Sequence, residues 1–279
     1  MNNTFGVILK NTTDVFKKSF WKITGIYASL LVLAVIFGIM SALFFGQEIM
    51  ALAAMGPENM DIISAMLPKI IVLGILATAF AFLFYMTGFW VVLIVRNTML
   101  IGQGFVKEAF FETLKKIWKV IFLSILIFVA IIVISAFFTI LLGKYGILIT
   151  IPVLIFCLPF FFTAFYGILC KEGKFWGILS EAWTLAISSW LKIIGYVLLL
   201  AISITVATGI VMAVAYALSK INLAIVGNIL SFICQIIISV FTTCFYTVFY
   251  LSLAGINPQE EKETEEIKTI HPKEITQNN

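Results

Sequence analysis

The stretch VIFLSILIFVAIIVISAFFTILLG, residues 120–143, decides the fold class because it has no charged side chain and is apolar on every face. A helix of about 20 residues crosses the hydrocarbon layer of a bilayer, and this run is longer. A β-barrel would show short segments of alternating apolar and polar side chains instead. The charge-free runs with this character are Ile23–Gln47, Ile70–Val95, Val120–Gly143, Tyr145–Cys170, Ile193–Ser219 and Ile221–Gln259. The sequence therefore predicts an all-α integral membrane protein with six transmembrane helices.

The composition of the whole chain points to the same class. Of its 279 residues, 62% are hydrophobic and 11% are charged, whereas a soluble domain carries roughly a quarter charged residues. High hydrophobicity and low charge also exclude a disordered chain. We predict one six-span membrane domain over residues 1–255 and a disordered, acidic, cytoplasmic tail over residues 256–279.

The basic residues orient the predicted spans, because Lys and Arg are retained on the cytoplasmic side of a membrane. They cluster before the first span, between the second and third, and between the fourth and fifth. The opposite loops hold only Lys69, Lys144 and Lys220. Both termini are therefore predicted to be cytoplasmic. The predicted outer connections are Gly46–Asp61, Gly143–Gly146 and Ser219–Asn222.

Three similar segments precede the first, third and fifth spans, namely Phe5–Phe20, Phe105–Ile117 and Phe175–Ser189. In the first, apolar residues recur at helical spacing while lysines take the other faces, which is typical of an amphipathic helix at the membrane surface. A shift of 170 residues aligns Lys22-Ile23 with Lys192-Ile193. We predict three interfacial amphipathic helices and three parallel two-span repeats, with units of about 5–95, 104–170 and 175–254. The alternative is that any segment before a span collects aromatic and basic residues.

The basic residues of these segments predict contact with anionic lipid headgroups. The residues concerned are Lys10, Lys17, Lys18, Lys107, Lys115, Lys116 and Lys174. The alternative explanation is that these lysines only follow the general tendency of basic residues to be retained on the cytoplasmic side. The bilayer is the expected partner in either case, with a membrane or cytoplasmic protein as a further partner and no nucleic acid.

A polar stripe runs along the last span. Its members are Asn228, Ser231, Gln235, Ser239 and Thr242, whose spacings of three and four residues place them on one helix face. Because unpaired polar groups are costly in lipid, the stripe is predicted to face the helix bundle. Two interpretations remain open: hydrogen bonding between helices, and the lining of a cavity or substrate path.

The paired acids, histidine clusters and serine–base pairs that an intramembrane hydrolase needs are absent from the predicted spans. The single histidine, His271, lies in the tail, and acids such as Glu112 and Glu181 lie among lysines, where a solvated or locally paired role is expected. Gly102-Gln103-Gly104 lacks the third glycine of a dinucleotide-binding fingerprint and predicts a turn before a helix. We predict that the chain is not an enzyme and has no catalytic, cofactor or metal site.

The chain resembles bacterial six-span membrane proteins related to the membrane domain of glycerophosphoryl diester phosphodiesterases. The resemblance is carried by Phe20-Trp21-Lys22, Glu181-Ala182-Trp183 and Trp190-Leu191-Lys192-Ile193-Ile194-Gly195, and by Arg96 followed by Gly102-Gln103-Gly104. It implies a fold and a location in the bacterial cytoplasmic membrane, but no activity, because only a short polar tail follows Gly255. The expected role is transport or lipid handling in the cell envelope. In this role the chain would be the membrane subunit of a larger complex. The alternative is a scaffold or immunity-type protein that acts through its lateral and cytoplasmic surfaces.

Overall fold

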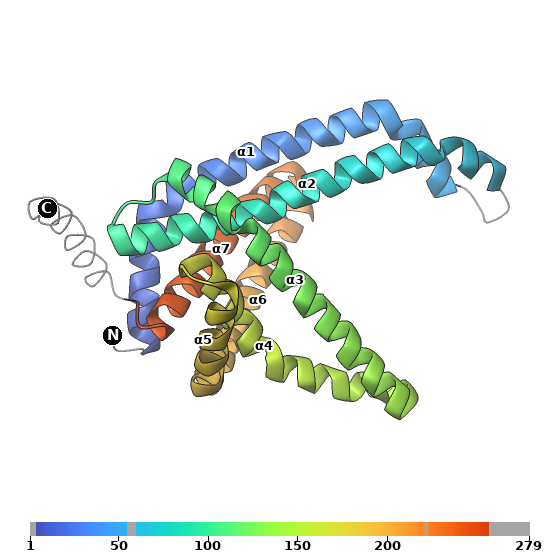
Figure 1. Ribbon diagram of the computed structural model, residues 1–279. Coiled ribbons are helices and arrows are strands. Elements are labelled where there is room, and N and C mark those ends of the chain that lie inside the picture. Colours follow the sequence, from blue (N-terminus) through green and yellow to red (C-terminus); the bar gives the residue numbers. More distant parts are fainter. Residues whose placement is uncertain (1–3, 55–59, 221–222, 257–279) are drawn as a thin grey trace, which may run out of the picture. The chain divides into compact units, whose positions relative to one another are not determined.

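The computed structural model describes residues 4–54, 60–220 and 223–256, and the regular structure in these ranges is entirely helical (Figure 1). Six of the helices are long and apolar enough to cross a membrane. This confirms the predicted class, an all-helical chain with six candidate spans. The helices are α1 (Phe5–Ala54), α2 (Met60–Ile101), α3 (Val106–Leu142), the 3₁₀ turn η1 (Gly143–Tyr145), α4 (Gly146–Cys170), α5 (Phe175–Ser188), α6 (Trp190–Lys220) and α7 (Ala224–Leu253).

The connections between helices agree only in part with the prediction. The turn predicted at Gly143–Gly146 is present as η1, where Gly143 has a φ of 56°. A Cβ atom at Gly146 would lie 2.5 Å from the carbonyl oxygen of Phe138, so the α3–α4 turn needs glycine there. The connection predicted around Gly46–Asp61 is largely helical where it is described, because α1 continues to Ala54 and α2 begins at Met60.

The chain divides into two compact units, and the smaller one comprises residues 21–89. It is formed by the later part of α1 and the earlier part of α2, which run side by side (Figure 1). The rings of Phe37 and Phe80 stack across this pair with centroids 5.2 Å apart. Most other large apolar side chains of this unit are exposed, as expected for helices whose solvent is lipid.

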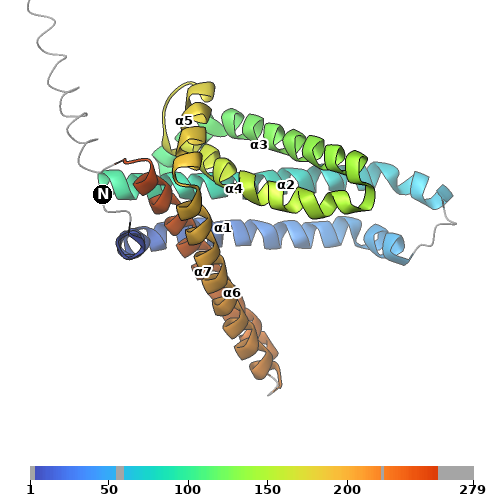
Figure 2. The ribbon, with the colours of Figure 1, turned by 90° about the horizontal axis from the view of Figure 1, so that it is seen from below.

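The larger unit contains the described residues up to Phe20 and from Trp90 onwards. Two helix pairs, α3 with α4 and α6 with α7, pack side by side in it (Figure 2), and α5 packs against α4. Its fully buried aromatic side chains, Phe245, Phe249 and Tyr250, belong to the last turns of α7. The packed core therefore lies at the charged ends of the helices, and the more distant parts of the spans expose apolar side chains.

The three predicted interfacial segments differ in how they join their spans. The first two are continuous with them, as the initial turns of α1 and α3. The third is the separate helix α5, and a turn at Ser189 divides it from α6. Serine hydroxyls compete for backbone groups and weaken a helix. The hydroxyl of Ser188 donates a hydrogen bond to the carbonyl of Leu185 at 3.1 Å beside this turn.

Candidate functional site

The polar stripe predicted on the last span lies on α7, but most of it is exposed. Asn228, Gln235 and Ser239 are exposed, and Ser231 and Thr242 are half-buried. The amide of Gln235 donates to the hydroxyl of Ser231 at 3.4 Å, a bond within the stripe itself. The other helices of the larger unit therefore leave most of the stripe uncovered, and its two interpretations stay predictions. Spacing defines a helix face correctly, but it does not say what covers that face.

The seven lysines predicted to meet anionic lipid fall into two groups. Six are exposed, as contact with headgroups requires: Lys10, Lys17, Lys18, Lys107, Lys115 and Lys174. Lys116 is the exception, because it is buried and its ammonium group is bonded within the protein. The prediction of a lipid contact does not fit Lys116.

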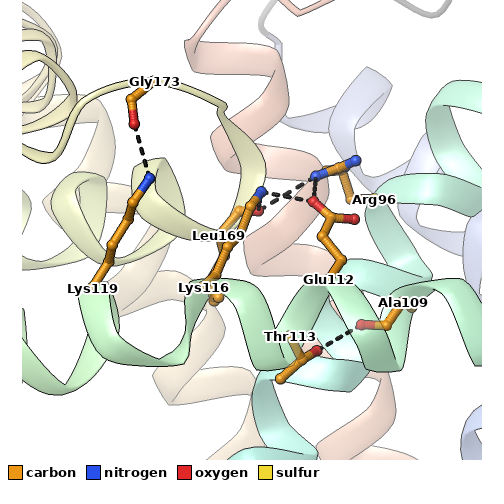
Figure 3. A network of polar contacts seen from close by, with 8 residues as sticks. All are labelled: Arg96, Ala109, Glu112, Thr113, Lys116, Lys119, Leu169 and Gly173. Carbon is orange, nitrogen blue, oxygen red and sulfur yellow. Dashed lines mark hydrogen bonds and ion pairs between the residues drawn. The ribbon is translucent and has the colours of Figure 1, made fainter.

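Lys116 belongs to a cluster of charged residues that joins the ends of three helices (Figure 3). Glu112 Oε1 lies 2.5 Å from Nη1 of Arg96 and 2.7 Å from Nζ of Lys116. The side chains of Arg96, Glu112 and Lys116 are only 13%, 19% and 9% exposed. Arg96 comes from α2, and the other two lie one turn apart on α3. One carboxylate is therefore shared by two cations in a largely buried site, and we call these three residues the charged cluster.

The charged cluster also binds the C-terminal end of α4. Lys116 Nζ donates to the carbonyl of Leu169 at 2.7 Å, and Arg96 Nη1 reaches the same oxygen at 3.5 Å. Lys119 Nζ donates to the carbonyl of Gly173 just beyond this helix at 2.8 Å. The last carbonyls of a helix lack partners and carry partial negative charge, so cations stabilise them. The arrangement fastens α2, α3 and α4 together.

A signal for the buried position of Lys116 exists in the sequence. Ala109, Thr113, Lys116 and Val120 recur at intervals of three and four residues, and all four are buried. Lys116 therefore lies on the packed face of the helix, whereas Lys115 lies outside it. Glu112, one turn earlier, is the matching partner for a cation on that face. The contribution of Arg96 could not be read in this way, since it comes from another helix.

The remaining sequence motifs have structural roles in the described residues. Gly102 has a φ of 80° between α2 and α3, so the predicted turn at Gly102-Gln103-Gly104 is confirmed. Of the two roles expected for the acids, solvated or locally paired, Glu112 and Glu181 have the paired one, and Oε2 of Glu181 lies 2.6 Å from Nζ of Lys171. Within the described ranges, no three His, Cys, Asp or Glu side chains gather as metal ligands would.

The fold and these features define the class as a polytopic α-helical membrane protein. In comparisons with known proteins, no family model, curated protein or solved structure matches the chain. The resemblance to bacterial six-span membrane proteins therefore stays a prediction.

Proposed function

We propose that the chain is a non-enzymatic protein of the bacterial cytoplasmic membrane that acts in transport or in lipid handling in the cell envelope. In this proposal it serves as the membrane subunit of a larger complex, with both termini in the cytoplasm. The observation that carries the proposal is the row of exposed polar side chains on α7, formed by Asn228, Gln235 and Ser239.

An exposed polar row needs a partner at membrane depth. An amide group in hydrocarbon without hydrogen bonds costs several kcal/mol, roughly 2–7. A protein surface or a water-lined path beside α7 would remove this cost. Because the row contains no ionisable side chain, it suits a small neutral or amphipathic molecule, or a polar helix of a partner, better than coupling to an ion.

The proposed architecture is three parallel repeats, each an amphipathic segment followed by two spans. Burial at aligned positions supports it: shifts of 97 and 170 residues align Ile23 with Val120 and with Ile193, and each of the three is fully buried. Eleven residues earlier, Thr12, Ala109 and Ala182 are buried as well. Matching burial indicates that the three segments present equivalent faces to the protein.

Complementation of a deletion strain tests the proposed role of α7. The double variant Asn228→Leu, Gln235→Leu removes both amides while keeping the helix apolar, and we expect it to lose complementation. Ser203→Leu is the control, because Ser203 is exposed on α6 and its hydroxyl bonds only its own helix, to Leu199. Full complementation by the double variant at normal protein levels would rule out a functional polar row.

The exposed lysines favour a second candidate function, a scaffold that acts through its cytoplasmic surface. Lys17, Lys18 and Lys115 lie on the first and second amphipathic segments and are exposed. Charge reversal of all three to Glu should then abolish function, while the changes on α7 do nothing. The reverse outcome supports transport or lipid handling.

A further inference from the structure

A pocket of about 340 Å³ lies between α5, the residue after α4 and the last turn of α7, all within the larger unit. Its polar lining consists of Lys171, Ser180, Glu181, Thr184, Ser188 and Tyr250. The volume falls in the range of small-molecule sites. The charged cluster and the polar row on α7 contribute nothing to this lining, so the pocket is a separate feature.

The pocket wall presents two opposite charges at short range. Lys171 Nζ and Glu181 Oε2 are 2.6 Å apart, and their side chains are 28% and 63% exposed. An ion pair with this exposure contributes little to stability, so a ligand can replace each partner with its own charge. A ligand that exchanges with both needs an anion and a cation separated by a short linker.

The surroundings of the pair add places for a cation and for an apolar group. Ser180, Thr184 and Ser188 lie one turn apart along the same face of α5, and their hydroxyl oxygens can accept hydrogen bonds from an ammonium group. The C-terminal end of α7 carries partial negative charge, which also favours a cation. Leu185 and Leu253 complete the lining with apolar surface.

We infer that this pocket binds a phosphate–ammonium zwitterion, with the ammonium on Glu181 and the phosphate on Lys171. In a membrane the matching ligand is the ethanolamine headgroup of a phospholipid. Its primary ammonium donates three hydrogen bonds, whereas the quaternary ammonium of choline donates none. A glycerol headgroup has no cation, and would leave Glu181 facing a phosphate of like charge.

The inference rests on the proposed function only in that the chain lies in a bilayer. It names a ligand class for lipid handling, but the pocket is distinct from the polar row on α7. Binding is measured on the purified chain and complementation is measured in cells, so either can fail without the other.

Native mass spectrometry of the full chain in detergent tests the inference, with dioleoyl phosphatidylethanolamine, phosphatidylcholine and phosphatidylglycerol as probes. We expect the ethanolamine lipid to bind about tenfold more tightly than the other two, since charged hydrogen bonds are worth about this factor. Glu181→Gln and Lys171→Gln should each remove the preference. Glu172→Gln and Lys192→Gln are matched controls, because these exposed residues carry the same charges but lie outside the pocket lining.

Soluble phosphoethanolamine, added as a competitor, separates the two sources of the headgroup. Displacement of the lipid at similar concentrations would assign the site to the free compound, and no displacement would assign it to the lipid. The inference is overturned if the ethanolamine lipid binds no better than the other two. It is equally overturned if Glu181→Gln and Lys171→Gln retain the preference that their controls show.

Discussion

Glu112→Gln tests the charged cluster most severely, because it removes the one carboxylate that pairs with two largely buried cations. Arg96 and Lys116 would keep their positions against the Leu169 carbonyl, at 3.5 and 2.7 Å, but with no anion between them. Breaking a buried pair by removing one partner costs about 3–5 kcal/mol. Since these side chains keep between 9% and 19% exposure, we expect a loss of about 3 kcal/mol in the free energy of unfolding.

The assay is reversible unfolding of the purified chain in mixed detergent micelles. The circular dichroism signal of the helices measures the unfolded fraction. Glu181→Gln is the matched control, because it makes the same chemical change in a pair whose carboxylate is 63% exposed. An exposed pair is worth about 0–1 kcal/mol. The reasoning is refuted if Glu112→Gln destabilises the chain no more than Glu181→Gln does.

A double variant separates a lost attraction from a charge left without its partner. Glu112→Gln combined with Lys116→Gln removes the surplus cation along with the carboxylate. We expect it to recover part of the stability lost in Glu112→Gln, since the unpaired buried charge is the larger cost. A double variant that is less stable than either single variant would contradict this explanation.

Glycine substitutions provide two further predictions. Gly167→Ala should lower stability by about 1 kcal/mol, because its Cβ would lie 3.1 Å from Ile178 and 3.2 Å from the hydroxyl of Tyr250, both buried. Gly195 has open space around it, so Gly195→Ala should leave stability unchanged or raise it. Thermal unfolding in detergent measures both variants, and an equal loss of stability in Gly167→Ala and Gly195→Ala would contradict the packing described at Gly167. Gly102→Ala should cost about 1 kcal/mol in the same assay, because L-residues are strained at a φ of 80°. If Gly102→Ala is as stable as the unchanged chain, the positive φ at Gly102 is contradicted.

The helical spans were predictable because charge-free runs of sufficient length are decisive in a lipid solvent. Their ends were less so. Residues Met50 to Ala54 favour a helix and extend α1 into the predicted outer connection. Helix propensity does not change at the edge of the bilayer, so it does not mark where a span leaves the membrane. The junctions between the interfacial segments and their spans were equally hard to predict, because one is broken at Ser189 while those in α1 and α3 are continuous.

The candidate sites were predictable only where a single helix contains the information. Helical spacing places Lys116 on a packed face, together with Glu112 one turn away. The ion pair with Arg96 joins residues 16 positions apart in the chain, and its formation depends on how α2 meets α3. The pocket beside α5 was missed for the same reason, since its lining comes from three separate segments.

Cysteine labelling in cells tests the central claim, that the chain has six spans and that its lysine-rich segments and both termini lie in the cytoplasm. The four native cysteines, Cys157, Cys170, Cys234 and Cys244, are first replaced by alanine. Lys144→Cys at the α3–α4 turn and Lys174→Cys before α5 are then exposed to a maleimide that cannot cross the membrane. We predict that intact cells label only the cysteine at position 144, and that position 174 reacts only after permeabilisation. Labelling of position 174 in intact cells would contradict the account.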